Sequence, residues 1–215
     1  MLVTDVSRSM AWSGDAETVL SKLDYVQRLA AVLALLLIRQ RDAVGLIAFD
    51  ETVRSVVPAR ARPAQWHQLL ATLNVLTPGK GTAAEPALRR VVDLLRRRGL
   101  VIFISDLLLD RETALRALKF LRHRGHQVIV LHVMDPAELE LGGPAEARFE
   151  DPETQQGVTL RPKDWADAYR ETVLGVVKAW RRACRGSGMQ YHQITTDTPF
   201  GLALRRVVGG ASGQT

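Results

Sequence analysis

Short runs of β-branched and aliphatic residues alternate with long amphipathic stretches along most of the 215-residue chain, and this alternation limits the folds that it can adopt. Strand–helix units of this kind build a parallel sheet, because each helix carries the chain back across the sheet between two strands. The pattern predicts an α/β fold with a doubly wound, mostly parallel sheet and helices on both faces. The predicted strands are Leu2–Thr4, Val44–Phe49, Val53–Val57, Val101–Ser105, Gln127–His132 and Gln190–Ile194. The predicted helices are Lys22–Arg39, Ala64–Leu73, Ala84–Arg97, Arg111–Arg124, Trp165–Arg185 and Pro199–Val208.

Two parts of the sequence depart from this alternation of strands and helices. The second and third predicted strands are separated by only Asp50-Glu51-Thr52, which is too short for a crossover, so they form an antiparallel pair with one strand at the sheet edge. Within residues 135–164, the segments Ala147–Glu150 and Val158–Leu160 flank a turn-rich stretch, which predicts an acidic hairpin insertion. We therefore expect one domain over residues 1–208 and a disordered tail over residues 209–215.

Composition excludes several classes of protein. With 47% hydrophobic and 24% charged residues the chain has the character of a soluble globular protein, and its single cysteine, Cys184, rules out an internal disulfide. The longest apolar run, Leu29–Ile38, has ten residues, whereas spanning a bilayer takes about 20. We expect no secretory signal, because the chain opens directly with a strand-like segment. We expect a cytoplasmic protein. Only Met1–Thr4 precede the first loop, so the first predicted strand looks shortened, and a longer form of the protein could associate with a membrane.

Oxygen-bearing side chains follow two of the predicted strands. Asp5, Ser7 and Ser9 come directly after the first strand, and alternate side chains of an extended chain share a face, so the three can converge. Asp106 ends the fourth strand. In the common doubly wound order 3-2-1-4-5-6 the first and fourth strands are neighbours, which places Asp5 and Asp106 side by side at the carboxyl edge of the sheet. Thr82, on the loop before the third predicted helix, can reach the same edge.

Two carboxylates and three hydroxyls make a hard-oxygen ligand set of the kind that Mg²⁺ prefers, and another divalent cation such as Mn²⁺ could bind instead. The two aspartates balance the charge of the ion, while neutral hydroxyl ligands leave it electrophilic toward one more oxygen. A carboxylate from a protein partner could supply that oxygen. The sequence therefore predicts a noncatalytic, metal-dependent protein-interaction module.

The pattern Asp5-x-Ser7-x-Ser9, followed by Thr82 and then Asp106, resembles the metal-ion-dependent adhesion site of von Willebrand factor A domains. In that family the serines and the threonine offer hydroxyls to the metal, and the aspartates often act through water. The resemblance implies a von Willebrand A-like fold.

Six segments carry a second resemblance: Asp5-Val6-Ser7-Arg8-Ser9-Met10, Ser21-Lys22-Leu23, Asp42-Ala43-Val44-Gly45-Leu46, Ile104-Ser105-Asp106, Asp135-Pro136-x-Glu138 and Thr196-Asp197-Thr198-Pro199. Through them the chain resembles, over nearly its whole length, the bacterial domain-of-unknown-function family fifty-eight. Members are often encoded with MoxR-type AAA+ ATPases, which implies such an ATPase as partner and a role in the assembly or activation of protein complexes. Typical members also carry an N-terminal region, frequently with membrane helices, that does not occur among these 215 residues.

Each predicted ligand also has a simpler explanation. Thr82 could only cap the helix that follows, since Thr82-Ala83-Ala84-Glu85 has the pattern of a capping box. Ser7 and Ser9 could be turn residues, and the two aspartates could be strand-end acids that face water. The joint placement of all five favours the metal site.

A Mg²⁺-dependent phosphatase is the first alternative function. Asp5, Lys80 and Ser105-Asp106-x-x-x-Asp110 are similar to haloacid-dehalogenase-type phosphatases, in which an aspartate attacks phosphorus. Those enzymes need a second aspartate two residues after the nucleophile as general acid. This chain has Ser7 there, and a hydroxyl cannot replace that proton donor. Asp110 is also well placed to cap the next helix.

Nonspecific nucleic-acid binding is the second alternative, because the net charge of the chain is +6. Residues 135–155 hold seven acids and one base, a net charge of −6, so the remainder carries +12. Many bases stand at predicted helix ends, where cations complement the helix dipole. An arginine-rich, solvated surface is therefore the favoured interpretation, and nucleic acid is an unlikely partner.

Two further regions could contact a protein partner. The four tryptophans, Trp12, Trp66, Trp165 and Trp180, are expected to be core anchors, although Trp12 follows the predicted metal ligands and could instead border a bound partner. The acidic hairpin, with Glu150, Asp151 and Glu153, is the second candidate contact surface.

Overall fold

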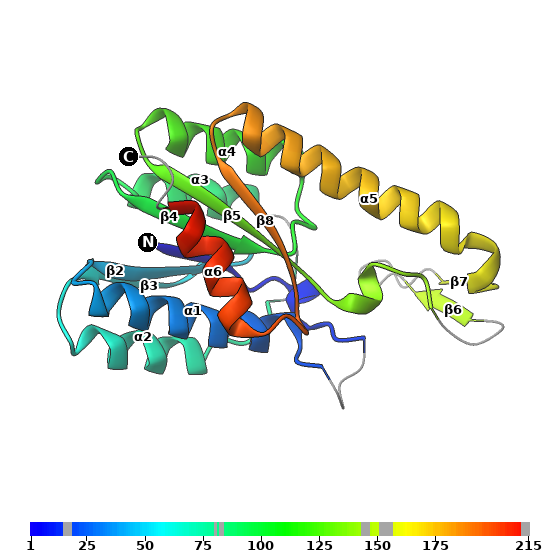
Figure 1. Cartoon of the computed structure of the whole chain (residues 1–215), viewed down its shortest axis with the longest axis horizontal. Coiled ribbons are helices and arrows are strands. Elements are labelled where there is room, and N and C mark those ends of the chain that lie inside the picture. Colours follow the sequence, from blue (N-terminus) through cyan, green and yellow to red (C-terminus); the bar gives the residue numbers. More distant parts are fainter. Residues whose placement is uncertain (15–18, 80, 82–83, 143–146, 151–156, 212–215) are drawn as a thin grey trace.

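Six strands form the main sheet of the protein in a computed structural model, which describes residues 1–14, 19–79, 81, 84–142, 147–150 and 157–211. The strands are β1 (Leu2–Asp5), β2 (Val44–Phe49), β3 (Val53–Arg60), β4 (Leu100–Ser105), β5 (Gln127–Met134) and β8 (Gln190–Thr195). Their order is β3-β2-β1-β4-β5-β8, with β3 antiparallel to β2 and all other neighbours parallel (Figure 1). The predicted doubly wound sheet with one antiparallel edge strand is confirmed.

Helices cover both faces of this sheet. On one face lie α1 (Lys22–Arg39), α2 (Gln65–Asn74) and α6 (Phe200–Ala211), and on the other lie α3 (Glu85–Leu94), α4 (Arg111–His123) and α5 (Pro162–Gly186). Each face of the sheet has its own hydrophobic core, and successive residues of a strand point alternately into one core and the other. Leu2 and Ile102 therefore pack under α1, while Val3 and Phe103 pack under α3 and α4. Burial on both faces explains why the central strands β1, β2, β4 and β5 are mostly apolar. Among the described residues, no helix has both the length and the apolar character needed to span a bilayer.

Some element boundaries differ from the sequence prediction. β3 and α6 each continue three residues beyond their predicted ends, to Arg60 and Ala211. α3 ends at Leu94, three residues early, because Leu95 leaves the helical conformation with φ −87° and ψ 69°. α5 begins at Pro162, since the fixed φ of proline suits the first turn of a helix.

The predicted hairpin is present as a separate pair of antiparallel strands, β6 (Ala147–Glu150) and β7 (Gly157–Leu160). It follows the 3₁₀ turn η2 (Pro136–Glu138) and leads into α5, whose first half extends past the sheet (Figure 1). We call residues 162–175 of α5 the overhang. The second half of α5 is anchored in the core by Val177, Trp180 and Cys184.

The tryptophans divide between core and surface. Trp180 is buried and Trp66 is partly buried, as expected for core anchors. The same expectation is wrong for Trp165, which is 57% exposed because it lies on the overhang, where no sheet covers it. Trp12 is 43% exposed, so it is not a core anchor either, and it remains available to a partner.

Gly45 on β2 provides a test of the packing between β2 and β3. A Cβ atom there would lie 2.5 Å from the carbonyl oxygen of Val57 and 2.7 Å from the amide nitrogen of Ala59. Since both are backbone atoms of the paired strand, we expect Gly45→Ala to lower the free energy of unfolding by about 2 kcal/mol in urea denaturation. Gly175→Ala is the control, because no atom lies within 4 Å of the added Cβ and alanine favours a helix by roughly 0.5–1 kcal/mol. Equal destabilisation by the two substitutions would contradict this account.

Candidate metal-binding site

Asp5 and Asp106 lie at the carboxyl ends of adjacent parallel strands. Thr4 of β1 pairs with Ile104 of β4, so Asp5 is level with Ser105, whose hydroxyl donates a 2.6 Å hydrogen bond to Asp5 Oδ2. Asp5 is fully buried and Asp106 is 3% exposed. The sheet order therefore places two carboxyl groups together at the topological switch point, which is where open α/β sheets bind ligands.

Ser7 and Ser9 approach each other through a turn instead of an extended strand. The chain leaves β1 and enters the 3₁₀ turn η1 (Arg8–Ala11), so the predicted extended alternation through Ser9 is wrong. The turn still brings the two hydroxyls together, with Ser7 Oγ 3.2 Å from Ser9 Oγ, while the Ser7 amide donates a 2.8 Å hydrogen bond to Asp5 Oδ1. Thr82, the fifth predicted ligand, lies outside the described residues, and α3 begins at Glu85 with Ala84 in the N-cap position.

Lys22 is a site residue that the sequence reasoning missed. Its side chain is fully buried, and its ammonium nitrogen Nζ lies 2.8 Å from Asp106 Oδ2 and 2.5 Å from Glu138 Oε1. Lys22 is the first residue of α1, directly after the N-cap Ser21. A cation at a helix N-terminus is disfavoured by the helix dipole, so this position was a signal that Lys22 needs an acidic partner.

Glu138 and Asp135 connect this ion pair to neighbouring loops. Glu138 Oε2 accepts a 2.8 Å hydrogen bond from the Asp135 amide, and the backbone carbonyl of Glu138 accepts one of 3.1 Å from the Tyr169 hydroxyl on the overhang. Asp135 accepts hydrogen bonds from the Gly14 amide at 3.1 Å and the Ala137 amide at 2.9 Å. The end of β5, η2 and the loop before α1 therefore meet beside Lys22.

The electrostatics of the site are those of buried, mutually repelling acids. Burial and the negative charge of Asp106 raise the pKa of Asp5 to about 7, against the lowering effect of its hydrogen bonds from Ser105 and Ser7. Burial also raises the pKa of Glu138 despite its ion pair. For Lys22, burial favours the neutral form, but Asp106 and Glu138 outweigh it and raise the pKa. Asp5, Asp106, Glu138 and Lys22 carry a formal net charge of −2 when all are ionised.

The residues present are compatible with a divalent cation. The Asp5 carboxylate accepts hydrogen bonds from the Ser7 amide and the Ser105 hydroxyl, and the two serine hydroxyls add neutral oxygens. Across the part of the chain that the structure describes, no three His, Cys, Asp or Glu side chains gather closely enough to hold a metal by themselves. An ion at this edge therefore needs the hydroxyls as well as the carboxylates.

Two exposed apolar side chains flank the site. The Trp12 ring centroid lies 5.9 Å from Lys22 Nζ, and Leu108, just after Asp106, is 60% exposed. Between Asp106 and Leu108, Leu107 has a φ of 57°, an uncommon conformation for a residue other than glycine. The turn is held by hydrogen bonds from the Leu107 amide to Ser105 Oγ and from the Leu108 amide to Asp106 Oδ1. Backbone strain of this kind is often found at functional sites.

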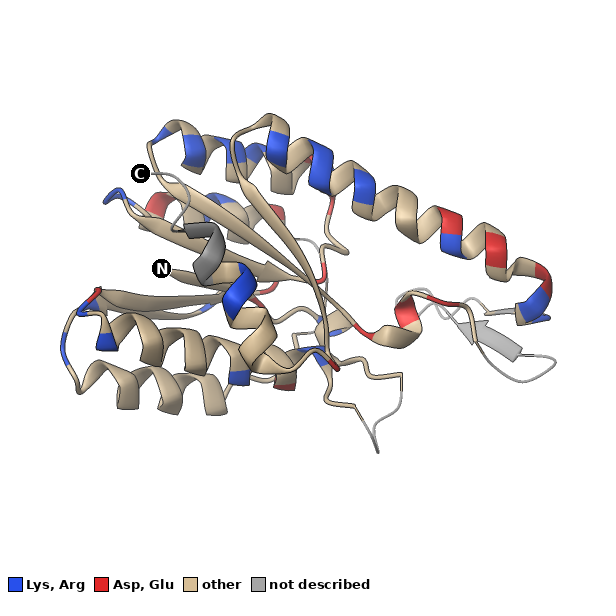
Figure 2. Cartoon of the chain, in the orientation of Figure 1, with Lys and Arg blue, Asp and Glu red and all other residues tan. Residues whose placement is uncertain are grey.

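The other predicted partner contacts lie at the acidic hairpin. Glu150 ends β6, although its side chain is not described, and Asp151 and Glu153 lie outside the described residues. Charge is also segregated along α5 (Figure 2): the overhang holds Asp164, Asp167 and Glu171 with two bases, and the second half holds four bases and no acid.

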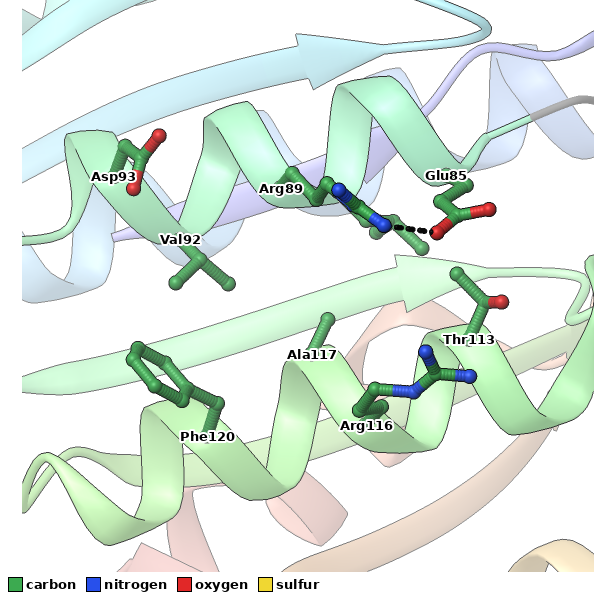
Figure 3. Close-up of a pocket in the computed structure, with 9 residues that line it drawn as sticks. Glu85, Arg89, Val92, Asp93, Thr113, Arg116, Ala117 and Phe120 are labelled. Carbon is green, nitrogen blue, oxygen red and sulfur yellow. Dashed lines mark hydrogen bonds and ion pairs between the residues drawn. The ribbon is translucent and has the colours of Figure 1, made fainter.

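A groove between α3 and α4 is separate from this site (Figure 3). Its volume is about 380 Å³, and Val92, Ala117 and Phe120 form part of its apolar lining. Near one end, Arg89 and Glu85 make an ion pair of 2.6 Å. None of the candidate metal ligands lines the groove.

The six-stranded sheet with its antiparallel edge pair and two helical layers is a doubly wound α/β fold. The chain belongs to the DUF58 family, a protein family of unknown function, whose model matches residues 1–175. This confirms the resemblance seen in the sequence.

Several known proteins are similar to this chain over most of its length. The uncharacterized protein Rv1480 of Mycobacterium tuberculosis is 27% identical over 96% of this chain, which spans 65% of the length of that relative. Among solved structures, the conserved hypothetical protein BatB from Bacteroides thetaiotaomicron has a TM-score of 0.59 at 17% identity, covering 99% of this chain and 98% of that one. An aerotolerance-related membrane protein from Bacteroides fragilis, crystallised with multiple mutations to serines, has a TM-score of 0.63 at 18% identity, covering 97% and 95% of the two chains.

Proposed function

We propose that this domain is a noncatalytic protein-interaction module that binds Mg²⁺, or another divalent cation such as Mn²⁺, through Asp5, Ser7, Ser9 and Asp106, with Thr82 as a further ligand. The observation that carries the proposal is the burial of two mutually repelling carboxyl groups beside two hydroxyls that lie 3.2 Å apart. A divalent cation supplies the missing positive charge, and a bound ion offers a coordination position to a carboxylate from a partner.

The partner in this proposal is a protein that presents an acidic side chain to the ion and apolar side chains to Trp12 and Leu108. The family resemblance favours a MoxR-type AAA+ ATPase, with a role in the assembly or activation of protein complexes. The acidic overhang and hairpin suit an arginine-rich groove on such a partner. We place the domain in the cytoplasm. In longer members it would stand next to a membrane, since a structural relative is named a membrane protein.

Direct measurement of metal binding tests the proposal. Titration with Mn²⁺, followed by electron paramagnetic resonance, is expected to give one saturable site from which Mg²⁺ competes the ion. Mg²⁺ is also expected to raise the thermal midpoint, and EDTA to reverse the increase. Ser9→Ala removes one neutral ligand and should weaken Mn²⁺ binding about tenfold, which is about 1.4 kcal/mol. The absence of a saturable site in the wild-type protein would exclude the proposal.

A phosphatase assay on the same purified protein distinguishes an interaction module from a phosphatase. Ser7 stands where the phosphatase needs its general acid, and Asp110 is exposed, caps α4 and accepts a 2.8 Å hydrogen bond from the Thr113 amide. Hydrolysis of p-nitrophenyl phosphate is therefore expected to stay at the buffer rate. Turnover that disappears in Asp5→Asn would reverse this conclusion.

A further inference from the structure

The ammonium group of Lys22 occupies a position next to the proposed metal ligands. It contacts Asp106 Oδ2 at 2.8 Å, while the other oxygen of Asp106 accepts a hydrogen bond from the Leu108 amide. Lys22 comes from α1, Asp106 follows β4 and Glu138 ends η2, so three segments far apart in the sequence converge on one buried cation. A buried ammonium between two carboxylates already supplies part of the positive charge that a metal ion would bring.

Formal charges show how much positive charge Lys22 supplies. Asp5, Asp106 and Glu138 together carry −3, and Lys22 reduces this sum to −2. Two cations that share the Asp106 carboxylate repel each other strongly in a buried site, because the effective dielectric constant there is well below that of water. Lys22 therefore opposes a divalent ion at Asp106, and the carboxylate of a partner would offset this repulsion.

We propose that Lys22 is a built-in counter-cation that lowers the affinity of the site for a divalent ion, so that the ion binds more tightly when a protein partner adds its carboxylate. This inference rests on the proposed function, and it makes binding of the ion and of the partner mutually dependent. In the absence of an ion, Lys22 stabilises the buried acids and keeps the site assembled.

Two charge-changing variants test the inference in opposite directions. Lys22→Met removes the competing cation and is expected to tighten Mn²⁺ binding at least tenfold in the electron paramagnetic resonance titration. Glu138→Gln leaves Lys22 in place but removes one negative charge, and is expected to weaken Mn²⁺ binding at least fivefold. The matched controls are Lys119→Met and Glu112→Gln, exposed positions on α4 whose substitution should leave the affinity unchanged. Acetate, as a probe for a partner carboxylate, should tighten Mn²⁺ binding more in the wild type than in Lys22→Met.

The outcomes separate this inference from the proposed function. Unchanged or weaker Mn²⁺ binding by folded Lys22→Met, when the wild type binds, would overturn the counter-cation role and leave the metal site intact. If Lys22→Met does not fold, Glu138→Gln decides, because it keeps the Lys22–Asp106 ion pair: unchanged or tighter binding would overturn the inference. Failure of the wild type and both variants to bind Mn²⁺ would overturn the proposed function and the inference with it.

Discussion

Asp5→Ala is expected to abolish divalent-ion binding, with a loss of Mn²⁺ affinity of at least a hundredfold, in a protein that stays folded. Asp5 is fully buried and lies level with Ser105 at the switch point between β1 and β4. Without this carboxylate the ion loses an anionic ligand. The remaining carboxylates, Asp106 and Glu138, carry a formal charge of −2, and Lys22 cancels half of it. The substitution leaves the Ser7 amide and the Ser105 hydroxyl without an acceptor, but it also removes the repulsion with Asp106. These opposed effects should keep the change in stability small.

Two measurements on Asp5→Ala check this result: the Mn²⁺ titration, and the thermal midpoint with and without Mg²⁺. Asp110→Ala is the control, since it removes an exposed carboxylate that caps α4 and takes no part in the proposed site. It should bind Mn²⁺ as the wild type does and lose only a little stability. Retention of the full Mg²⁺-induced thermal shift by folded Asp5→Ala would contradict the assignment of Asp5 as a ligand.

Trp180→Ala is expected to destabilise the protein by about 3–5 kcal/mol, because truncation of a buried tryptophan removes apolar contacts and leaves a cavity. Trp180 is 1% exposed and anchors the second half of α5 to the core under α4. Trp165→Ala is the matched control on the same helix. It is 57% exposed, so its substitution should change the free energy of unfolding by about 0.5 kcal/mol or less. Urea denaturation measures both, and similar losses for the two variants would show that the overhang is anchored as firmly as the second half of α5.

The sheet could be predicted because local patterns indicate its strands, and the common doubly wound order 3-2-1-4-5-6 then arranges them. The three-residue gap after Phe49 requires an antiparallel pair, and the amphipathic stretches between the other strands require crossovers. With the hairpin strands counted as second and third, β1 and β4 become neighbours, as observed. Helix boundaries were less predictable, since they depend on single backbone conformations such as that of Leu95.

The site could be predicted only in part, and the reason is sequence separation. Asp5 and Asp106 are placed by strand order, so their proximity follows from the predicted sheet. The contacts of Lys22 with Asp106 and Glu138 join residues 84 and 116 positions apart, and no periodic pattern links these residues. The turn at Ser9 was also missed, because a 3₁₀ turn of four residues has no distinct apolar periodicity.

The short turn η2 lies between the overhang of α5 and the buried ion pair of Lys22. Glu138 receives the Tyr169 hydroxyl on its backbone carbonyl and the Lys22 ammonium on its carboxylate. A displacement of Tyr169 on the overhang would therefore act on the same residue that holds the Lys22 ammonium group. Glu138 therefore connects the overhang of α5 to the buried ion pair between Lys22 and Asp106 through one short turn.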